Sequence, residues 1–284
     1  MQNNFLSGSI GSITASEAAS MEEWLEYCDS QGADLAYLSD SYDLFVRDTM
    51  REQMFFARHK RYRYSTYEEV SQKVYFNPEY MRKYMYGLSV STFLWPNHRL
   101  MNEYFKRTLP DRAGGRYLEV GPGHGFNMLM AMASTSYESY EGIDISPASV
   151  ALTQSVLDRH PLAASKKFSV RQADFLQFSS ATPYDVLVMG EVLEHVENPR
   201  QFLEKIADLT HRNTHIYLST CINAPEVDHI SLFRNISELR ELFGSSGLTI
   251  CDQLVLPNNN LSLEEAERRE APINVAFILK IACP

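Results

Sequence analysis

A glycine-rich turn between a strand pattern and a helix pattern restricts the possible folds of this chain most strongly. The short apolar run Arg116–Val120 leads into residues 121–125, which read Gly-Pro-Gly-His-Gly, and the helical composition of Phe126–Ala133 follows directly. Glycines let the backbone turn sharply and approach a ligand without Cβ clashes, while the helix N-terminus offers free N–H groups. The turn therefore predicts an α/β domain with a ligand site at the end of its first strand.

Strand and helix patterns alternate from this turn to the end of the chain. Ser146 and Pro147 are typical of a helix start, with the helix running to about His160, and Asn198 begins a further helix. This alternation predicts parallel pairing with right-handed crossovers, hence a doubly wound, mostly parallel sheet of seven strands. Only Leu261–Arg269 leaves room for a helix before the last strand, so we expect that strand to pair antiparallel. After Arg116–Val120 the expected strands are Tyr137–Asp144, Phe168–Ala173, Tyr184–Met189, Thr214–Thr220, Leu248–Leu256 and Ile273–Ile281.

Helical patterns dominate residues 1–110. Thr14 and Glu17 have the spacing of a capping box, in which each side chain accepts a hydrogen bond from the backbone of the other. Few strand patterns occur before residue 111, where the character of the chain changes. We therefore expect a helical N-terminal lobe over residues 1–110 and a ligand-binding α/β domain over residues 111–284. The expected helices of the lobe are Ala18–Cys28, Leu44–Phe56, Tyr67–Val74, Pro78–Met85 and His98–Phe105.

The spacing of the glycines argues against two common nucleotide sites. A dinucleotide fingerprint that starts at Gly121 requires glycine at position 126, where Phe126 stands. The sequence also lacks a phosphate-binding loop that ends in Gly-Lys-Ser or Gly-Lys-Thr. Binding of a pyrophosphate or a triphosphate at this turn is therefore disfavoured.

The motifs around this turn resemble those of class I S-adenosylmethionine-dependent methyltransferases. Glu119 and the three glycines have the form Glu/Asp-x-Gly-x-Gly-x-Gly of the first motif of the family, and later motifs follow in order over residues 112–284. Gly190–Val196 looks like the Glu-Val-Leu-Glu-His-Val motif of small-molecule methyltransferases of the ubiquinone-biosynthesis type. The resemblance implies a Rossmann-like methyltransferase fold with S-adenosylmethionine as cofactor. The implied cofactor-binding residues are Glu119, Gly121, Gly123, Gly125, Asp144, Ile145, Asp174, Phe175 and Glu191.

The acidic residues among them have separate expected contacts. Asp144 closes the second strand and matches the acid that binds the ribose hydroxyls, because a carboxylate can accept from two adjacent hydroxyls. Asp174 and Phe175 match the acid and the aromatic ring beside the adenine. The alternatives are that Glu119 is a surface acid and that Asp174 only caps the end of a strand. We interpret His124, within the turn, as a local hydrogen-bonding residue.

Two histidines are candidates for a general base. Methyl transfer from a sulfonium is an in-line displacement, so the enzyme aligns the acceptor, excludes water and, for an alcohol or phenol, removes a proton. His195 and His229 follow strands at the edge where open α/β sheets bind ligands. Asp228 adjoins His229 in sequence, which leaves open whether the two side chains meet. The alternative for Glu194 and His195 is a satisfied polar pair. We expect no metal, because no set of clustered Asp or Asn ligands stands out.

Residues 51–110 are the one basic part of an acidic chain. They hold eleven basic and five acidic residues and eight of the sixteen tyrosines, whereas residues 1–50 hold nine acidic residues and one basic residue. Small-molecule members of the family often carry a helical cap over the substrate, so we expect a lid here. Tyr84, Trp95 and His98 are its candidate substrate contacts, and its arginines are candidates to hold a carboxylate or phosphate. The alternative is that the tyrosines pack the core and the basic residues pair with the acidic residues 1–50.

Charge and apolar content exclude several classes of partner. The formal net charge of −10 argues against a protein that coats nucleic acid or binds membranes through basic residues. The N-terminus lacks a signal-peptide pattern, no apolar stretch reaches about 18 residues, and the four cysteines lie far apart. We expect a cytoplasmic protein with reduced thiols and with no nucleic-acid or membrane partner. A homodimer is one option.

The sequence favours methyl transfer from S-adenosylmethionine to an O or N atom of a small-molecule acceptor. Specialised metabolism is one setting for this reaction, and an anionic acceptor is one option. Met189–Val192 does not match the Asn/Asp-Pro-Pro-Tyr/Phe motif of amide and adenine N-methyltransferases. Two alternatives stay open. One is a protein or peptide methyltransferase, and the other is a non-catalytic regulatory protein that binds S-adenosylmethionine.

Overall fold

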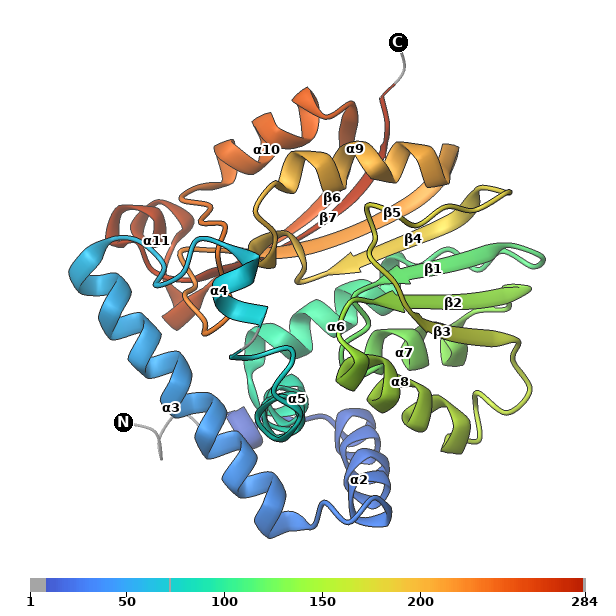
Figure 1. Cartoon of the computed structure of the whole chain (residues 1–284), viewed down its shortest axis with the longest axis horizontal. Coiled ribbons are helices and arrows are strands. Elements are labelled where there is room, and N and C mark those ends of the chain that lie inside the picture. Colours follow the sequence, from blue (N-terminus) through green and yellow to red (C-terminus); the bar gives the residue numbers. More distant parts are fainter. Residues whose placement is uncertain (1–8, 72, 283–284) are drawn as a thin grey trace.

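A seven-stranded sheet forms the centre of the computed structural model, which describes residues 9–71 and 73–282 (Figure 1). The strands are β1 (Arg116–Val120), β2 (Ser139–Asp144), β3 (Phe168–Gln172), β4 (Tyr184–Gly190), β5 (Thr210–Ile222), β6 (Leu248–Pro257) and β7 (Ile273–Ile281). Their order in the sheet is β3-β2-β1-β4-β5-β7-β6, and all neighbours are parallel except β7, which is antiparallel to β5 and β6. The doubly wound sheet expected from the sequence is confirmed, with its antiparallel last strand.

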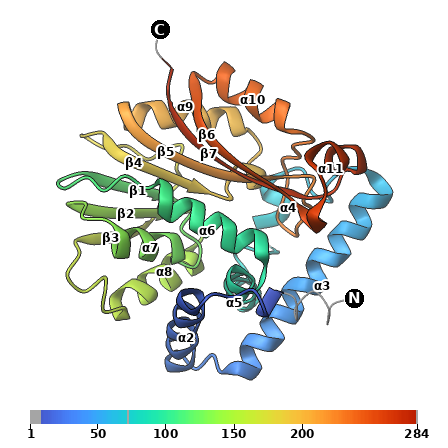
Figure 2. The ribbon, with the colours of Figure 1, turned by 180° about the vertical axis from the view of Figure 1, so that it is seen from behind.

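Helices cover both faces of the sheet. They are α6 (Pro96–Thr108), α7 (Phe126–Ser134), α8 (Pro147–Arg159), α9 (Pro199–Leu209), α10 (Ile236–Ser245) and α11 (Leu263–Arg269), with short 3-10 turns η1 (Leu193–His195) and η2 (Asn258–Asn260). Because side chains alternate along a strand, Tyr117 of β1 belongs to the same core cluster as Met128 of α7, and its neighbour Leu118 belongs to a second cluster with Leu203 of α9. Helices α6, α7 and α8 lie on the first face and α9 and α10 on the second (Figures 1 and 2).

The helices expected over residues 1–110 are present; the last of them, α6, packs on the sheet, and the helices before it form the lobe. The lobe contains α2 (Ala15–Ser30), α3 (Leu35–His59), α4 (Tyr67–Ser71) and α5 (Pro78–Leu94). Helices α3 and α5 approach closely at Gly87, where a Cβ atom would lie 2.4 Å from the backbone oxygen of Ser41. Helix α6 joins the lobe to the sheet, since the ring of Phe105 lies 4.9 Å from that of Tyr217 on β5. The lobe is thereby held beyond the C-terminal ends of β1 and β4 (Figure 1).

Capping side chains set the starts of several helices. Thr14 and Glu17 form the reciprocal capping box that the sequence predicts for α2. Ser146 and Asn198 each accept a hydrogen bond from the backbone N–H three residues further on, at the starts of α8 and α9. These local signals are visible in the sequence, which explains why the starts of α8 and α9 agree with the expected ones, while α2 begins at Ala15, directly after its cap and before the expected Ala18.

Two helices of the lobe are longer than expected. Helix α3 begins before the expected Leu44 because Asp34 caps it, accepting a hydrogen bond from the backbone N–H of Tyr37. Helix α5 continues past the expected end at Met85 and stops before Pro96, because the residue that precedes a proline is restricted to extended conformations. Its long buried stretch has no clear polar face, so helical periodicity is weak in the sequence.

Membrane segments and disulfides are features that the sequence argues against. Within residues 9–71 and 73–282, no helix has both the length and the apolar content needed to cross a bilayer. Cys28, Cys221 and Cys251 are free thiols, and the first two are buried. Cys283 lies outside the described residues, and so do residues 1–8, on which the signal-peptide interpretation rests.

Candidate functional site

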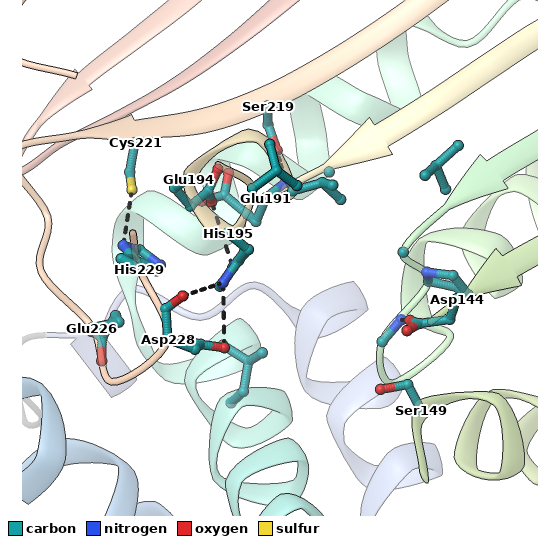
Figure 3. Close-up of a pocket in the computed structure, with 18 of the residues that line it drawn as sticks. Asp144, Ser149, Glu191, Glu194, His195, Ser219, Cys221, Glu226, Asp228 and His229 are labelled. Atoms are coloured by element: carbon teal, nitrogen blue, oxygen red, sulfur yellow. Dashed lines mark hydrogen bonds and ion pairs between the residues drawn. The ribbon is translucent and has the colours of Figure 1, made fainter. Parts of the chain in front are cut away.

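A cavity of about 840 Å³ lies at the C-terminal ends of β1, β2, β4 and β5. Figure 3 shows Asp144 at one end of it, Glu226 at the other and His195 between them. The lobe contributes lining residues from α3 and α5, together with Tyr67 and Tyr75. Open α/β sheets bind ligands at this edge, and the volume is in the range of sites for whole small molecules.

The glycine turn after β1 adopts a backbone that only glycine tolerates. Gly121, Gly123 and Gly125 have φ angles of 70°, 58° and 80°, in the left-handed region that favours glycine. A Cβ atom on Gly121 would lie 2.7 Å from Cγ2 of Val192. Gly121 and Gly123 line the cavity, whereas Gly125 lies behind it, where a Cβ atom would be 3.1 Å from Thr153 of α8. Gly125 thus brings α7 and α8 together rather than lining the cavity.

Asp144 and Ile145 line the cofactor end of the cavity, the end beside the glycine turn. Asp144 Oδ1 accepts from the N–H of Ser146 at 2.8 Å and Oδ2 from the N–H of Gly123 at 3.3 Å. Each oxygen keeps a further lone pair, so the carboxylate can still accept from two hydroxyls. Burial raises the pKa of Asp144 to about 6, and the two backbone N–H groups oppose this shift. Ile145 is 39% exposed and offers apolar surface beside the carboxylate.

We expect Asp144→Ala to weaken cofactor binding by about 1–3 kcal/mol, because the ribose hydroxyls would lose their acceptor. Titration calorimetry with S-adenosylhomocysteine measures the change in Kd. Asp158→Ala, which removes an exposed carboxylate from α8, is the matched control. An unchanged Kd in the Asp144 variant would rule out the ribose contact.

Glu119 lies at the end of β1 with 2% of its surface exposed, so the alternative of a surface acid is wrong. Its Oε2 accepts a hydrogen bond from the hydroxyl of Tyr117 at 2.5 Å. Burial raises the pKa of Glu119 to about 7, and the bond from Tyr117 opposes this shift. The residue also lines the cavity, where a cationic ligand would favour its ionised form.

Asp174 and Phe175 follow β3 and line the same end of the cavity. Asp174 Oδ1 accepts from the N–H of Leu176 at 2.9 Å, so its carboxylate also caps the chain after the strand. Phe175 is buried against Phe202 of α9, with ring centroids 5.3 Å apart. Asp174 therefore does cap the chain after β3, as the alternative interpretation states. Its contact with the adenine stays a prediction.

Glu191 and Glu194 follow β4 in the middle of the cavity (Figure 3). The N–H of Glu191, a residue with a φ of 51°, donates to the backbone oxygen of Ser219 at 3.0 Å. Glu194 Oε2 accepts from Oγ1 of Thr220 at 2.6 Å, while its buried Oε1 has no hydrogen-bond partner within the described residues. The pKa values of both carboxyls are raised, chiefly because both are shielded from bulk water. Glu194 and His195 do not satisfy one another, because Oε1 lies 4.0 Å from Nε2 of His195.

His195 contacts the loop after β5 through its Nδ1 atom. Nδ1 lies 3.3 Å from Oδ2 of Asp228 and 3.1 Å from the hydroxyl of Tyr75. Asp228 also accepts hydrogen bonds from the hydroxyls of Tyr75 at 3.2 Å and of Tyr84 at 3.3 Å. A carboxylate beside Nδ1 favours the tautomer with the proton on that atom, which leaves Nε2 as the proton acceptor.

His229 lies beside His195, with ring centroids 4.7 Å apart and ring planes at 87°. Its Nδ1 is 2.6 Å from the backbone oxygen of Ala224, to which a ring N–H donates. Burial, and then the neighbouring His195, lower the pKa of His229 well below its usual value, so the ring stays neutral. Asp228 forms an ion pair with His195, whereas within the described residues it forms no hydrogen bond or ion pair with His229, its neighbour in sequence.

The candidate substrate contacts Tyr84, Trp95 and His98 all line the cavity. The ring of Trp95 lies 5.5 Å from that of Phe45 and 5.0 Å from that of His98. Burial lowers the pKa of His98 to about 4, so its ring is neutral, and its Nδ1 lies 3.1 Å from Oγ of Ser91. The structure therefore brings these three side chains to one cavity, and their contact with an acceptor stays a prediction.

The cavity has no arginine or lysine among its lining residues, within the part of the chain that the structure describes. Arg51 pairs with Asp48 at 3.0 Å, and Arg63 pairs with Glu52 at 2.8 Å. The expectation that arginines of residues 51–110 hold an anionic acceptor is therefore wrong. Both side chains pair with carboxylates of their own lobe.

Thr49, Tyr75 and Glu226 are cavity residues that the sequence does not single out. Thr49 Oγ1, from α3, donates to Oε2 of Glu226 at 2.9 Å. Glu226 and Asp228 flank Val227 just after a strand, at the edge where ligands bind, and this placement was an available signal. Tyr75 carried no such signal, because its partners are more than a hundred residues away in sequence.

Two overlapping groups of side chains are close enough to hold a metal ion. One contains Glu194, Cys221 and His229, the other contains His195, Asp228 and His229, and the ligand atoms in each group lie within 4.8 Å of one another. Cys221 belongs to β5, and the other residues come from the separate segments after β4 and β5. A search of the sequence for clustered Asp or Asn ligands therefore does not find them, and the absence of a metal stays a prediction.

Residues 96–253 match a family model described as a methyltransferase domain, which spans more than half of the chain. The chain belongs to this family. The methyltransferase carries its glycine turn and Asp144 where the class I S-adenosylmethionine-dependent enzymes are expected to hold their cofactor. No curated protein matches its sequence significantly.

Solved structures of other methyltransferases and related enzymes share the fold. The mitomycin 7-O-methyltransferase MmcR has a TM-score of 0.57 at 14% identity, over 83% of this chain and 68% of that one. The cyclopropane synthase MmaA2 from Mycobacterium tuberculosis has a TM-score of 0.54 at 15% identity, over 66% of this chain and 85% of that one. The mycolic acid cyclopropane synthase CmaA1, complexed with SAH and CTAB, has a TM-score of 0.53 at 16% identity, over the same shares. At sequence identities this low, the TM-scores show a common fold and nothing more.

The cofactor end of the cavity fits S-adenosylmethionine, the cofactor of this family. Gly121 leaves backbone space that a Cβ atom would fill, and Asp144 keeps free lone pairs at the end of β2. Glu119, Asp144 and Ile145 line this end of the cavity, where the two acids would supply negative charge for a sulfonium and Ile145 an apolar surface for the base.

Proposed function

We propose that the methyltransferase acts on an O or N atom of a small-molecule acceptor in specialised metabolism. One observation carries this proposal: a single cavity joins the glycine turn to His195, Asp228 and His229, and the N-terminal lobe lies over it. The N–H of Tyr67 donates to Oε1 of Glu197 at 2.7 Å, which ties the lobe to the segment after β4. A protein or peptide acceptor would need an open groove instead.

The residues of the cavity divide the reaction between them. S-adenosylmethionine, when bound, supplies a methyl group on a sulfonium whose departure needs no proton. Asp144 and the turn at Gly121 would hold it, while the lobe excludes water. His195 would take the proton of the acceptor on Nε2, because Asp228 holds its Nδ1–H. His229, neutral and fixed through Nδ1, would accept a hydrogen bond from the acceptor.

We expect label from methyl-labelled S-adenosylmethionine to pass into small molecules. The methyltransferase would be incubated with a cell extract separated into a protein fraction and a small-molecule fraction. Asp144→Ala serves as the control for cofactor-independent label. Label in the protein fraction alone would contradict the proposal. Cofactor binding without transfer to either fraction would favour the non-catalytic alternative.

A further inference from the structure

We propose that the acceptor carries an ammonium group, and that Glu226 and the rings of Phe45, Tyr84 and Trp95 bind it. This inference rests on the proposed function, because it takes the acceptor to be a small molecule. It assigns a binding role to the end of the cavity furthest from Asp144, which we call the Glu226 subsite (Figure 3). The ammonium group serves recognition, and the methyl-accepting atom lies nearer His195.

Glu226 is half-buried in the loop after β5 and has an incomplete set of partners. Its Oε2 accepts from Oγ1 of Thr49 at 2.9 Å, and within the described residues no other side chain donates to its carboxylate. Burial raises the pKa of Glu226 well above its usual value, and the carboxylates of Asp228, Asp48 and Glu52 raise it further. This carboxylate has other carboxylates near it, and no arginine or lysine among the lining residues of its cavity in the described part of the chain, so it lacks a cationic partner.

The acceptor half of the cavity, by which we mean the part from Glu194 and His195 to Glu226, has the same shortage of positive charge. Glu194 and Asp228 line it, and Oε1 of Glu194 is a buried oxygen that has no hydrogen-bond partner in residues 9–71 and 73–282. Neither Arg51 nor Arg63 lines the cavity, and both are paired with acids of the lobe. A carboxylate or phosphate on the acceptor would meet repulsion here, whereas an ammonium group would supply the missing charge.

Three aromatic side chains, Phe45, Tyr84 and Trp95, line the same cavity as Glu226. The ring of Phe45 lies 5.5 Å from the ring of Tyr84 and 5.5 Å from that of Trp95. Thr49, which holds Glu226, is one helical turn from Phe45 on α3. An ammonium group binds to a carboxylate and to ring faces together. A neutral apolar group would pack against the rings but leave the carboxylate of Glu226 unpaired. The rings and the carboxylate together therefore favour a cation.

Three matched compounds test the subsite: 2-phenylethylamine, 2-phenylethanol and phenylacetate. Each is titrated by calorimetry into the protein saturated with S-adenosylhomocysteine, so that no methyl transfer occurs. We expect the amine to bind roughly 10–100-fold more tightly than the alcohol or the carboxylate, the scale for a hydrogen bond to a charged group. Equal binding of the three compounds, tighter binding of phenylacetate, or no detectable binding of the amine would overturn the proposal.

Substitutions locate the effect. Glu226→Gln should lower affinity for the amine roughly 10–100-fold and leave the Kd of S-adenosylhomocysteine unchanged. Glu241→Gln, an exposed position on α10, is the matched control. Phe45→Leu should lower affinity for the amine roughly 2–30-fold with a smaller effect on the alcohol. Unchanged amine affinity in Glu226→Gln would overturn the proposal.

Two further titrations distinguish the ammonium subsite from a metal site and from a failure of cofactor binding. If Mn²⁺ alone binds and Glu226→Gln removes that binding while amine affinity is unchanged, the subsite is a metal site and the proposal fails. If the wild-type protein does not bind S-adenosylhomocysteine, the proposed function fails. The amine is then titrated into the free protein, where its loss of binding in Glu226→Gln still supports a cation subsite.

Discussion

Replacing His195 by alanine is expected to lower turnover by roughly 10²–10⁴-fold, the range for loss of a general base, and to leave the Kd of the cofactor unchanged. The reason is the arrangement of its ring, in which Asp228 lies 3.3 Å from Nδ1 and leaves Nε2 as the proton acceptor. Release of labelled methyl product, with the acceptor found in the small-molecule fraction, measures turnover. Calorimetry with S-adenosylhomocysteine measures cofactor binding.

Two companion variants separate catalysis from packing. Asp228→Asn should also lower turnover, because an amide does not hold the Nδ1–H tautomer of His195 as a carboxylate does. His59→Ala, at the exposed end of α3, is the control for loss of an imidazole. Turnover close to that of the wild-type protein in His195→Ala would assign His195 a structural role. His229→Ala would then be the next variant to assay.

Strands of the sheet were predictable where apolar runs end at turn residues. The observed bounds of β1 and β7 equal the expected ones, because both are mostly apolar runs flanked by turn residues. Strand β5 starts at Thr210, before the expected Thr214, because the added residues are polar and stand outside the apolar run. The position of β7 between β5 and β6 is a matter of tertiary packing. Strand β7 is nearly completely buried and its sequence is mostly apolar, whereas the partly exposed β6 contains more polar residues. This difference in composition is how the strand order is reflected in the sequence.

The cofactor end was predictable because its residues follow consecutive strands in short motifs. The backbone of Gly121 and the hydrogen bond from Ser146 to Asp144 are local, so sequence spacing indicates them. The acceptor half depends on pairs distant in sequence, such as Tyr75 with Asp228 and Thr49 with Glu226. No sequence pattern specifies such pairs, because the packing of the lobe on the sheet creates them.

Replacing Glu119 by glutamine is expected to stabilise the cofactor-free protein near pH 8. Its carboxyl has a pKa of about 7 in the folded protein, against an ordinary value of 4.5, because it is buried. A pKa raised by folding means that ionisation opposes folding. The full stability is therefore present below about pH 4.5 and is lost as the pH rises through 7, a loss of roughly 3 kcal/mol. Glutamine cannot ionise, and its amide oxygen still accepts from Tyr117.

Urea unfolding at two pH values measures this effect. The free energy of unfolding of Glu119→Gln should exceed that of the wild-type protein by roughly 3 kcal/mol near pH 8 and by less than about 1 kcal/mol near pH 5. Glu241→Gln, which removes an exposed carboxylate, should change little at either pH. An equal gain at both pH values would point to packing and not to ionisation.

The same substitution is expected to weaken cofactor binding near pH 8, which gives a physical reason for a buried acid at this position. S-adenosylmethionine carries a sulfonium, so its binding beside Glu119 favours the ionised carboxylate. Binding therefore recovers in the wild-type protein part of the free energy that ionisation costs the free protein. The ratio of the two Kd values, variant to wild type, should increase from pH 6 to pH 8. A variant that is more stable near pH 8 and binds the cofactor as tightly would remove Glu119 from the cofactor site.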